Sequence, residues 1–123
     1  MKILVVEDDQ ASREVLAKLL RYSGHEVLSA ENGLIALAQL EQTAPDVMLL
    51  DLMMPVMSGI EVLKFIRNSE LWKSLRVVVI SALSYGPELD IARSLGVETN
   101  FVKGTPYFNA LLERIGSGPS GIG

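Results

Sequence analysis

Polar side chains that can do chemistry follow several short apolar stretches of this chain. They comprise carboxylates, one hydroxyl and one amine, namely Glu7, Asp8, Asp9, Asp51, Ser81 and Lys103. Carboxylate oxygens without cysteine or histidine partners suit a hard cation such as Mg²⁺. A carboxylate is also a nucleophile that can form an aspartyl phosphate, and amine and hydroxyl groups stabilise phosphoryl oxygens. These residue types therefore predict metal-dependent phosphoryl chemistry at a carboxylate.

The acidic residues need a cation if they meet in one pocket. When the stretches that end at residues 6 and 50 are neighbouring strands, Glu7, Asp8 and Asp51 come together. Like charges at short range destabilise the fold unless a cation neutralises them. Because Mg²⁺ is commonly held by one or two carboxylates and a phosphate oxygen, we expect a site that a phosphoryl group completes. Asp9 has two interpretations, as a further acid of this group or as the N-cap of the next helix.

Strands and helices must alternate to position these residues. Residues 3–6, 47–50 and 77–80 are continuous apolar runs, as in strands buried on both faces, and residues 26–30 and 100–103 are weaker runs. Apolar residues at helical spacing lie between them. Short connections make each crossover parallel and right-handed, which predicts an α/β fold with helices on both faces of one sheet. The polar residues then lie at the carboxyl ends of the strands, where such sheets bind ligands.

The composition restricts the domain organisation and the class of function. A chain of 123 residues with 49% hydrophobic content fits one domain, which we assign to residues 1–115. Residues 116–123 are rich in glycine and serine, which predicts a flexible tail or linker. The net charge of −4 argues against direct nucleic-acid binding. No apolar run approaches the roughly 20 residues of a membrane span, so we expect a cytoplasmic protein without a membrane partner.

Several motifs together resemble those of a single family. They are ILVVEDD (residues 3–9), DLMMP (51–55) followed by SG (58–59), SA (81–82) and FVK (101–103). In this order and at strand ends, they are similar to the receiver domains of two-component response regulators, in particular the chemotaxis type. The resemblance covers nearly the whole chain. It implies a flavodoxin-like, doubly wound sheet of five parallel strands in the order 2-1-3-4-5 with five helices.

The resemblance also implies a role for each residue of the site. Asp8 is implied as a direct Mg²⁺ ligand and Glu7 as one that acts largely through water, and Asp51 and the backbone carbonyl of Met53 complete the set. The implied donor is a phosphohistidine on a sensor histidine kinase or phosphotransfer protein. The residues implied to carry the transfer are Asp51 as phosphoacceptor, Ser81 as the hydroxyl that contacts the phosphoryl group, and Lys103 as the phosphate-binding amine.

The function implied by the family is that of a signalling switch rather than a metabolic enzyme. Transfer is self-catalysed, and the aspartyl phosphate hydrolyses slowly without another protein. Family members often use the last two helices for dimers or output contacts, so a homodimer through these helices is one expectation. The sequence does not indicate an output target.

Two positions depart from the family pattern. Gly104 stands where the family usually has proline, and Asn100 stands where it tends to have an aromatic switch residue. Phe101 is adjacent, but it should point to the opposite side of the strand. These departures favour an alternative, a phosphate-independent pseudo-receiver that serves as an interaction module. An aspartyl-phosphate hydrolase is disfavoured by Met53, because such enzymes often carry a second acid two residues after the nucleophile.

Overall fold

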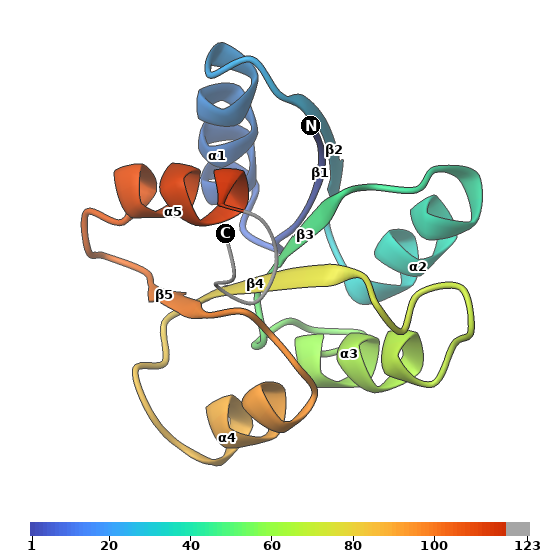
Figure 1. The fold of residues 1–123 in the computed structure, drawn as a ribbon. Coiled ribbons are helices and arrows are strands. Elements are labelled where there is room, and N and C mark those ends of the chain that lie inside the picture. Colours follow the sequence, from blue (N-terminus) through green and yellow to red (C-terminus); the bar gives the residue numbers. More distant parts are fainter. Residues whose placement is uncertain (118–123) are drawn as a thin grey trace.

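Strands and helices alternate along the whole of residues 1–117, which are the residues that the structure, a computed structural model, describes (Figure 1). The five strands and five helices that the sequence predicts are all present. They are β1 (Lys2–Val6), α1 (Gln10–Tyr22), β2 (Glu26–Ala30), α2 (Gly33–Gln42), β3 (Val47–Leu50), α3 (Gly59–Arg67), β4 (Arg76–Ser81), α4 (Pro87–Ser94), β5 (Asn100–Val102) and α5 (Phe108–Gly116).

The strands form one parallel sheet in the order β2-β1-β3-β4-β5. This order confirms the flavodoxin-like prediction. The direction in which the chain adds strands reverses between β1 and β3, where sheets of this kind bind ligands. Val6 pairs with Leu50, so the two strands end level with one another. The residues that follow β1 and β3 therefore leave the sheet side by side.

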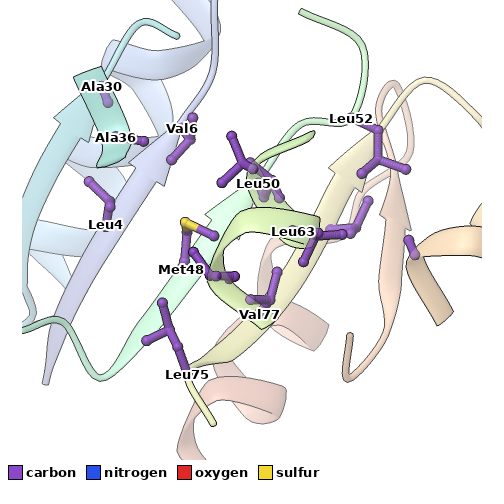
Figure 2. Packing of buried hydrophobic residues seen from close by; sticks show 14 of the residues in the cluster. Leu4, Val6, Ala30, Ala36, Met48, Leu50, Leu52, Leu63, Leu75 and Val77 are labelled. Carbon is purple, nitrogen blue, oxygen red and sulfur yellow. The ribbon is translucent and has the colours of Figure 1, made fainter. Parts of the chain in front are cut away.

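Helices cover both faces of the sheet (Figure 1). Alternate strand residues pack against α1 and α5 on one face and against α2, α3 and α4 on the other. Figure 2 shows the second face, where Met48 and Leu50 of β3 lie beside Leu63 of α3. Because both faces are covered, no residue of β3 is more than 1% exposed. This explains why its sequence is a continuous apolar run rather than an alternating one.

Polar side chains fix the starts of the helices near the carboxyl ends of the strands. Asp9 Oδ2 accepts a hydrogen bond from Ser12 N at 2.9 Å and caps α1. Ser58 Oγ accepts one from Glu61 N at 3.2 Å and caps α3. Of its two interpretations, Asp9 therefore takes that of the helix cap.

The last helix ends close to the predicted domain boundary. α5 runs to Gly116 with Ser117 as its C-cap, which is one residue beyond the predicted end at Ile115. Residues 118–123 of the predicted tail lie outside the described residues. Within residues 1–117, no helix has both the length and the apolar character needed to cross a membrane.

Candidate functional site

Two carboxylates leave the sheet from neighbouring strands. Glu7 follows β1 and Asp51 follows β3, directly beyond the paired residues Val6 and Leu50. Asp51 N donates a hydrogen bond to Val6 O at 3.1 Å, which holds the end of β3 against β1. The two residues remain buried where the chain leaves the core, with 5% of Glu7 and 4% of Asp51 exposed.

Asp8 joins these two residues in an acidic cluster. One carboxylate oxygen from each of Glu7, Asp8 and Asp51 lies within 4.8 Å of the others. Glu7 and Asp51 are buried, whereas Asp8 is exposed to the solvent. All three ligand atoms are oxygens, and Mg²⁺ prefers oxygen ligands and retains several waters. The cluster therefore fits Mg²⁺ better than a soft metal, which prefers sulfur ligands.

The backbone that carries the acidic cluster is fixed by several hydrogen bonds. Arg13 of α1 donates from Nη1 to Glu7 O at 2.9 Å and to Asp8 O at 3.3 Å. Asp9 N donates to Glu7 Oε2 at 3.2 Å. Burial raises the pKa of Asp8, and the neighbouring Glu7 carboxylate raises it further. The Glu7 contribution to the raised pKa reflects repulsion between neighbouring carboxylates, which the positive charge of Lys103 partly offsets.

Lys103 is the cation that joins the two buried carboxylates. Its Nζ lies 2.5 Å from Glu7 Oε1 and 2.9 Å from Asp51 Oδ2. Burial alone lowers the pKa of Lys103, but hydrogen bonds and charge interactions with Glu7 and Asp51 outweigh burial and raise it. Lys103 therefore stays protonated near neutral pH. One positive charge then faces three carboxylates, which leaves negative charge for an external cation to neutralise.

The chain that follows β3 wraps closely around Asp51. Met53 N donates a hydrogen bond to Asp51 Oδ1 at 3.2 Å. Gly59 N, at the start of α3, donates to Leu52 O at 3.0 Å. A Cβ atom at Gly59 would collide with the carbonyl oxygen of Asp51 and lie 2.7 Å from Leu52 Cα. Only glycine therefore allows α3 to begin this close to the acidic cluster.

Ser81 ends β4, the strand beside β3, and is fully buried. Its hydroxyl accepts a hydrogen bond from Leu83 N at 3.2 Å. Its backbone carbonyl accepts one from Lys103 N at 2.9 Å, which ties the end of β4 to the residue after β5. Ser81 thus lies at the same edge of the sheet as the acidic cluster but outside the ion pairs of Lys103.

A tight turn directs Lys103 toward the carboxylates without a proline after it. Thr105 N and Thr105 Oγ1 both donate to Val102 O, at 3.3 Å and 2.6 Å. Gly104, the third residue of this turn, has a φ of +86°. A type II turn requires such a conformation at its third position, and glycine adopts it without strain. No cis peptide bond occurs in residues 1–117. We name residues 102–105 the Lys103 turn.

A cavity of about 140 Å³ adjoins the acidic cluster. Its walls include Glu7, Asp51 and Lys103, together with Leu16 of α1 and Tyr107, the residue before α5. Burial raises the pKa of Tyr107; the positive charge of Lys103 opposes this shift and the negative charge of Glu7 adds to it. The Tyr107 hydroxyl therefore lies within electrostatic reach of the ion pair.

A family model matches this chain over nearly its whole length. The model of the response regulator receiver domain matches residues 3–115. The chain belongs to the response regulator receiver family. This match confirms the resemblance inferred from the sequence motifs. Receiver domains are phosphoacceptor domains of two-component signalling rather than classical enzymes, and they obtain phosphoryl groups from histidine kinases or phosphotransfer proteins.

Individual relatives cover most of the receiver domain. Sporulation initiation phosphotransferase F of Bacillus subtilis is 38% identical over 105 residues, which are 83% of this chain and 81% of that protein. Chemotaxis protein CheY4 of Vibrio cholerae is 27% identical, with a TM-score of 0.85 over 93% of this chain and 97% of that structure. TrrA of Thermotoga maritima, solved in complex with Mg²⁺ and BeF, is 29% identical, with a TM-score of 0.79 over 93% and 97%.

The structure brings most of the predicted site residues of this receiver domain together. Glu7, Asp8 and Asp51 form the acidic cluster, and Lys103 contacts two of them. Ser81 lies at the same edge of the sheet. The backbone N–H of Met53 lies beside the Asp51 carboxylate, although the residue as a whole is 55% exposed. The roles of these residues in metal binding and phosphoryl transfer stay predictions.

No role in the site was assigned from the sequence to three residues that shape it, namely Arg13, Gly59 and Tyr107. Gly59 lies in the SG motif, and a glycine directly after a helix cap is a signal of close backbone approach. Arg13 carries no such signal, because its contacts with Glu7 and Asp8 depend on how α1 packs. Tyr107 carries no such signal either, yet the structure places it beside Lys103 and Glu7 in the cavity wall.

Proposed function

We propose that this receiver domain takes a phosphoryl group onto Asp51 with the help of Mg²⁺ and acts as a signalling switch. The observation that carries the proposal is the acidic cluster, in which Lys103 supplies one positive charge to three carboxylates. Two of these carboxylates are buried and the third lies at the surface beside them, and such an excess of negative charge opposes folding unless a cation neutralises it. Bound Mg²⁺ would supply the missing positive charge, and a phosphoryl oxygen could then complete its ligands.

The proposed Mg²⁺ ligands are the acidic cluster and the backbone carbonyl of Met53. Asp8 contributes directly from the solvent side, and Glu7 contributes largely through water. When bound, the ion neutralises charge that develops on the phosphoryl oxygens. The relative TrrA, which was solved with Mg²⁺ and BeF, supports this assignment by similarity.

The proposed transfer uses Asp51 as nucleophile. An Asp51 carboxylate oxygen forms a bond to phosphorus, and the bond between phosphorus and the imidazole nitrogen of the donor phosphohistidine breaks. The imidazole keeps the electron pair of that bond and takes up a proton. Lys103, whose Nζ already lies 2.9 Å from Asp51 Oδ2, pairs with a phosphoryl oxygen. The Ser81 hydroxyl donates a hydrogen bond to another.

The proposed product is a signal that decays slowly. Met53 occupies the second position after Asp51, where hydrolases of aspartyl phosphates often carry an acid. Without that acid, water attacks the phosphoryl group slowly and without help from another protein. The domain is therefore proposed as a phosphoacceptor whose aspartyl phosphate hydrolyses slowly, and not as an aspartyl-phosphate hydrolase.

The phosphate-independent interaction module accounts for fewer features of the site. Gly104 was one reason to consider it, yet the Lys103 turn built on Gly104 still delivers the amine to both buried carboxylates. An interaction module has no use for an acidic cluster with surplus negative charge. Asn100 bears on how the phosphorylated state is read and leaves phosphoryl uptake unaffected.

The partners and boundaries of the domain are proposed on the strength of the family. The donor is a sensor histidine kinase or a phosphotransfer protein, and the domain acts in the cytoplasm. A homodimer through the last two helices, α4 and α5, is one proposed assembly, which is not tied to the phosphorylated state. Residues 1–115 are proposed as the receiver domain and residues 116–123 as a tail or linker.

Acetyl phosphate and Mg²⁺ provide the direct test, because a small acyl phosphate replaces the phosphohistidine donor. Mass spectrometry should show a single phosphoryl adduct that is stable in acid and labile in base. Asp51→Asn should abolish the adduct, since the amide is a poor nucleophile, whereas the matched variant Asp90→Asn, at an exposed position in α4, should retain it. An adduct that persists in Asp51→Asn, or that forms equally well in EDTA, would refute the proposal.

A further inference from the structure

Tyr107 stands between the acidic cluster and the surface of the domain. Besides lining the 140 Å³ cavity with Glu7, Asp51 and Lys103, it lines a groove of about 430 Å³ between α1 and the segment before α5. Leu16 and Ser12 also border both spaces, so the cavity and the groove are adjacent. A movement of the Tyr107 ring therefore changes the shape of both.

The groove is apolar and lies at the surface. Val15 and Leu19 of α1 are 58% and 42% exposed on its wall. Pro106 and Phe108 flank Tyr107 on the other side. The Tyr107 ring stacks on Phe101 of β5 with a centroid distance of 5.8 Å and an interplanar angle of 21°. Phe101 thus supports Tyr107 from the core side, on the face of the sheet covered by α1 and α5.

The Lys103 turn connects the acidic cluster to Tyr107 through short hydrogen bonds. Thr105 closes the turn on Val102, and Tyr107 N donates to Thr105 O at 2.9 Å. Only Gly104, Thr105 and Pro106 separate Lys103 from Tyr107. Because this segment is short and hydrogen-bonded, a displacement of Lys103 is expected to displace Tyr107 as well.

Phosphorylation changes the forces on Lys103. In the unmodified domain its ammonium group is shared between Glu7 and Asp51. A phosphoryl group on Asp51 brings a charge of about −2 and several acceptor oxygens. These draw the ammonium group away from Glu7, and the Lys103 turn moves with it.

The opposite face of the sheet has a polar residue where an aromatic switch is expected. Asn100, three residues before Lys103, is half-buried and carries an amide. The aromatic ring of β5 belongs instead to Phe101, which packs with α1 and α5. The aromatic contacts available to the Lys103 turn therefore lie on the α1 and α5 face.

We propose that phosphorylation of Asp51 is transmitted through the Lys103 turn to Tyr107, which reshapes the groove between α1 and the start of α5. This face of the receiver domain, rather than the α4 face, then reports the phosphorylated state. The inference rests on the proposed function, because it needs a phosphoryl group on Asp51. It adds which face of the domain changes its shape when Asp51 is phosphorylated.

Methyl NMR of the full chain with Mg²⁺ and beryllofluoride, a phosphoryl mimic, tests the direction. The methyl groups of Val15 and Leu19 should shift more than those of Leu89 and Ile91 in α4. Tyr107→Leu should lose the shifts at Val15 and Leu19, and Tyr107→Phe, which keeps the ring, should retain them. The matched variant Tyr85→Leu removes an exposed tyrosine before α4 and should also retain them.

Fluorine NMR of the same samples separates the two proposals, because it reports beryllofluoride binding directly. Circular dichroism confirms that each variant is folded. Bound beryllofluoride with shifts confined to α4, or with groove shifts that survive in Tyr107→Leu, overturns the coupling and leaves the proposed function intact. If wild type binds no more beryllofluoride than Asp51→Asn, the proposed function fails and the coupling fails with it.

Discussion

A cluster of charged residues, most of them buried or partly buried, lies at each end of the sheet. The two clusters differ in whether the protein itself supplies the opposite charges that neutralise them. The site cluster lies at the carboxyl ends of the strands and consists of Glu7, Asp8, Asp51 and Lys103. The basal cluster lies at the start of β4 and before β5, at the opposite end, and consists of Arg76, Glu98 and Arg114. Both clusters join elements that are far apart in sequence, so this property does not distinguish the role of one cluster from that of the other.

The basal cluster is completed by the chain itself. Arg76 pairs with Glu98 through both carboxylate oxygens, at 2.5 Å and 3.0 Å, and Arg114 lies 3.3 Å from the same carboxylate. Arg76 also donates to the carbonyls of Arg114 and Ile115 at the end of α5, at 3.1 Å and 3.0 Å. A helix C-terminus favours positive charge. The surplus positive charge therefore has its partners within the fold.

The site cluster has the opposite surplus. Lys103 is its cation, and three carboxylates face it. Within this cluster the pKa of Asp8 is raised, so its charged form is disfavoured. The loop that follows Asp51 also holds a strained residue, Val56. Two buried ionic clusters in one domain thus differ in whether the fold satisfies them. We infer that the unsatisfied cluster marks the proposed site and that the satisfied one stabilises the fold.

The largest expected effect comes from breaking the basal cluster. Glu98→Gln leaves two partly buried arginines without their carboxylate and should lower the free energy of unfolding by about 3 kcal/mol. Urea denaturation measures the change. Glu70→Gln is the matched control, because Glu70 pairs with Lys73 at 2.9 Å but is 89% exposed. That variant should lose less than about 1 kcal/mol.

Phosphoryl uptake separates the basal cluster from the site cluster. At a temperature where Glu98→Gln is folded, its reaction with acetyl phosphate should match that of wild type. A slower reaction in the folded variant would show that the basal cluster serves the chemistry as well as the fold, and the distinction between the two clusters would fail.

The sequence predicted the sheet and the acidic cluster for the same physical reason. Continuous apolar runs such as residues 47–50 require burial on both faces, which requires a parallel sheet between helices. Once β1 and β3 are neighbours, the carboxylates after them must meet. The strand order itself came from the family resemblance, because the periodicity of apolar residues does not rank neighbours.

The remaining features depend on contacts that have no local pattern. Arg76 and Glu98 are 22 residues apart, and neither lies in a motif. The reach of Lys103 to both carboxylates depends on the φ of +86° at Gly104, which glycine permits but does not impose. Gly59 is required by a close approach of two backbone segments that only the packed structure defines.

A smaller effect of opposite sign is expected at the site cluster. Asp8→Asn removes one of three carboxylates that repel one another, and should raise the free energy of unfolding by about 1 kcal/mol without Mg²⁺, since solvent screens the exposed Asp8 charge. Because Asp8 is a proposed Mg²⁺ ligand, added Mg²⁺ should stabilise the variant less than wild type. Urea denaturation with Mg²⁺ and with EDTA measures both changes.

The pH dependence checks the cause of the Asp8→Asn gain. The pKa of Asp8 is raised in the folded state above its ordinary value of 3.8. Lowering the pH therefore protonates Asp8 in the folded protein first, and the gain shrinks. Below pH 3.8 the residue is protonated in both states and the gain should vanish. A gain that is the same at every pH contradicts repulsion as its source.

The smallest expected effect concerns the strained backbone near the site cluster. Val56, in the loop between Asp51 and α3, has a φ of +71° and is 71% exposed. A β-branched residue is disfavoured in this left-handed region, whereas asparagine tolerates it. Val56→Asn should therefore raise the free energy of unfolding by about 0.5 to 1 kcal/mol, which urea denaturation measures.

Val56→Ala is the control, because it shortens the side chain but keeps a strained backbone. If both variants gain equally, the gain comes from removing an exposed apolar side chain and not from strain. If Val56→Asn alone gains while acetyl phosphate still modifies Asp51 at the wild-type rate, the strain is separable from the chemistry. The acidic cluster would then be the part of this end of the sheet that phosphoryl transfer requires.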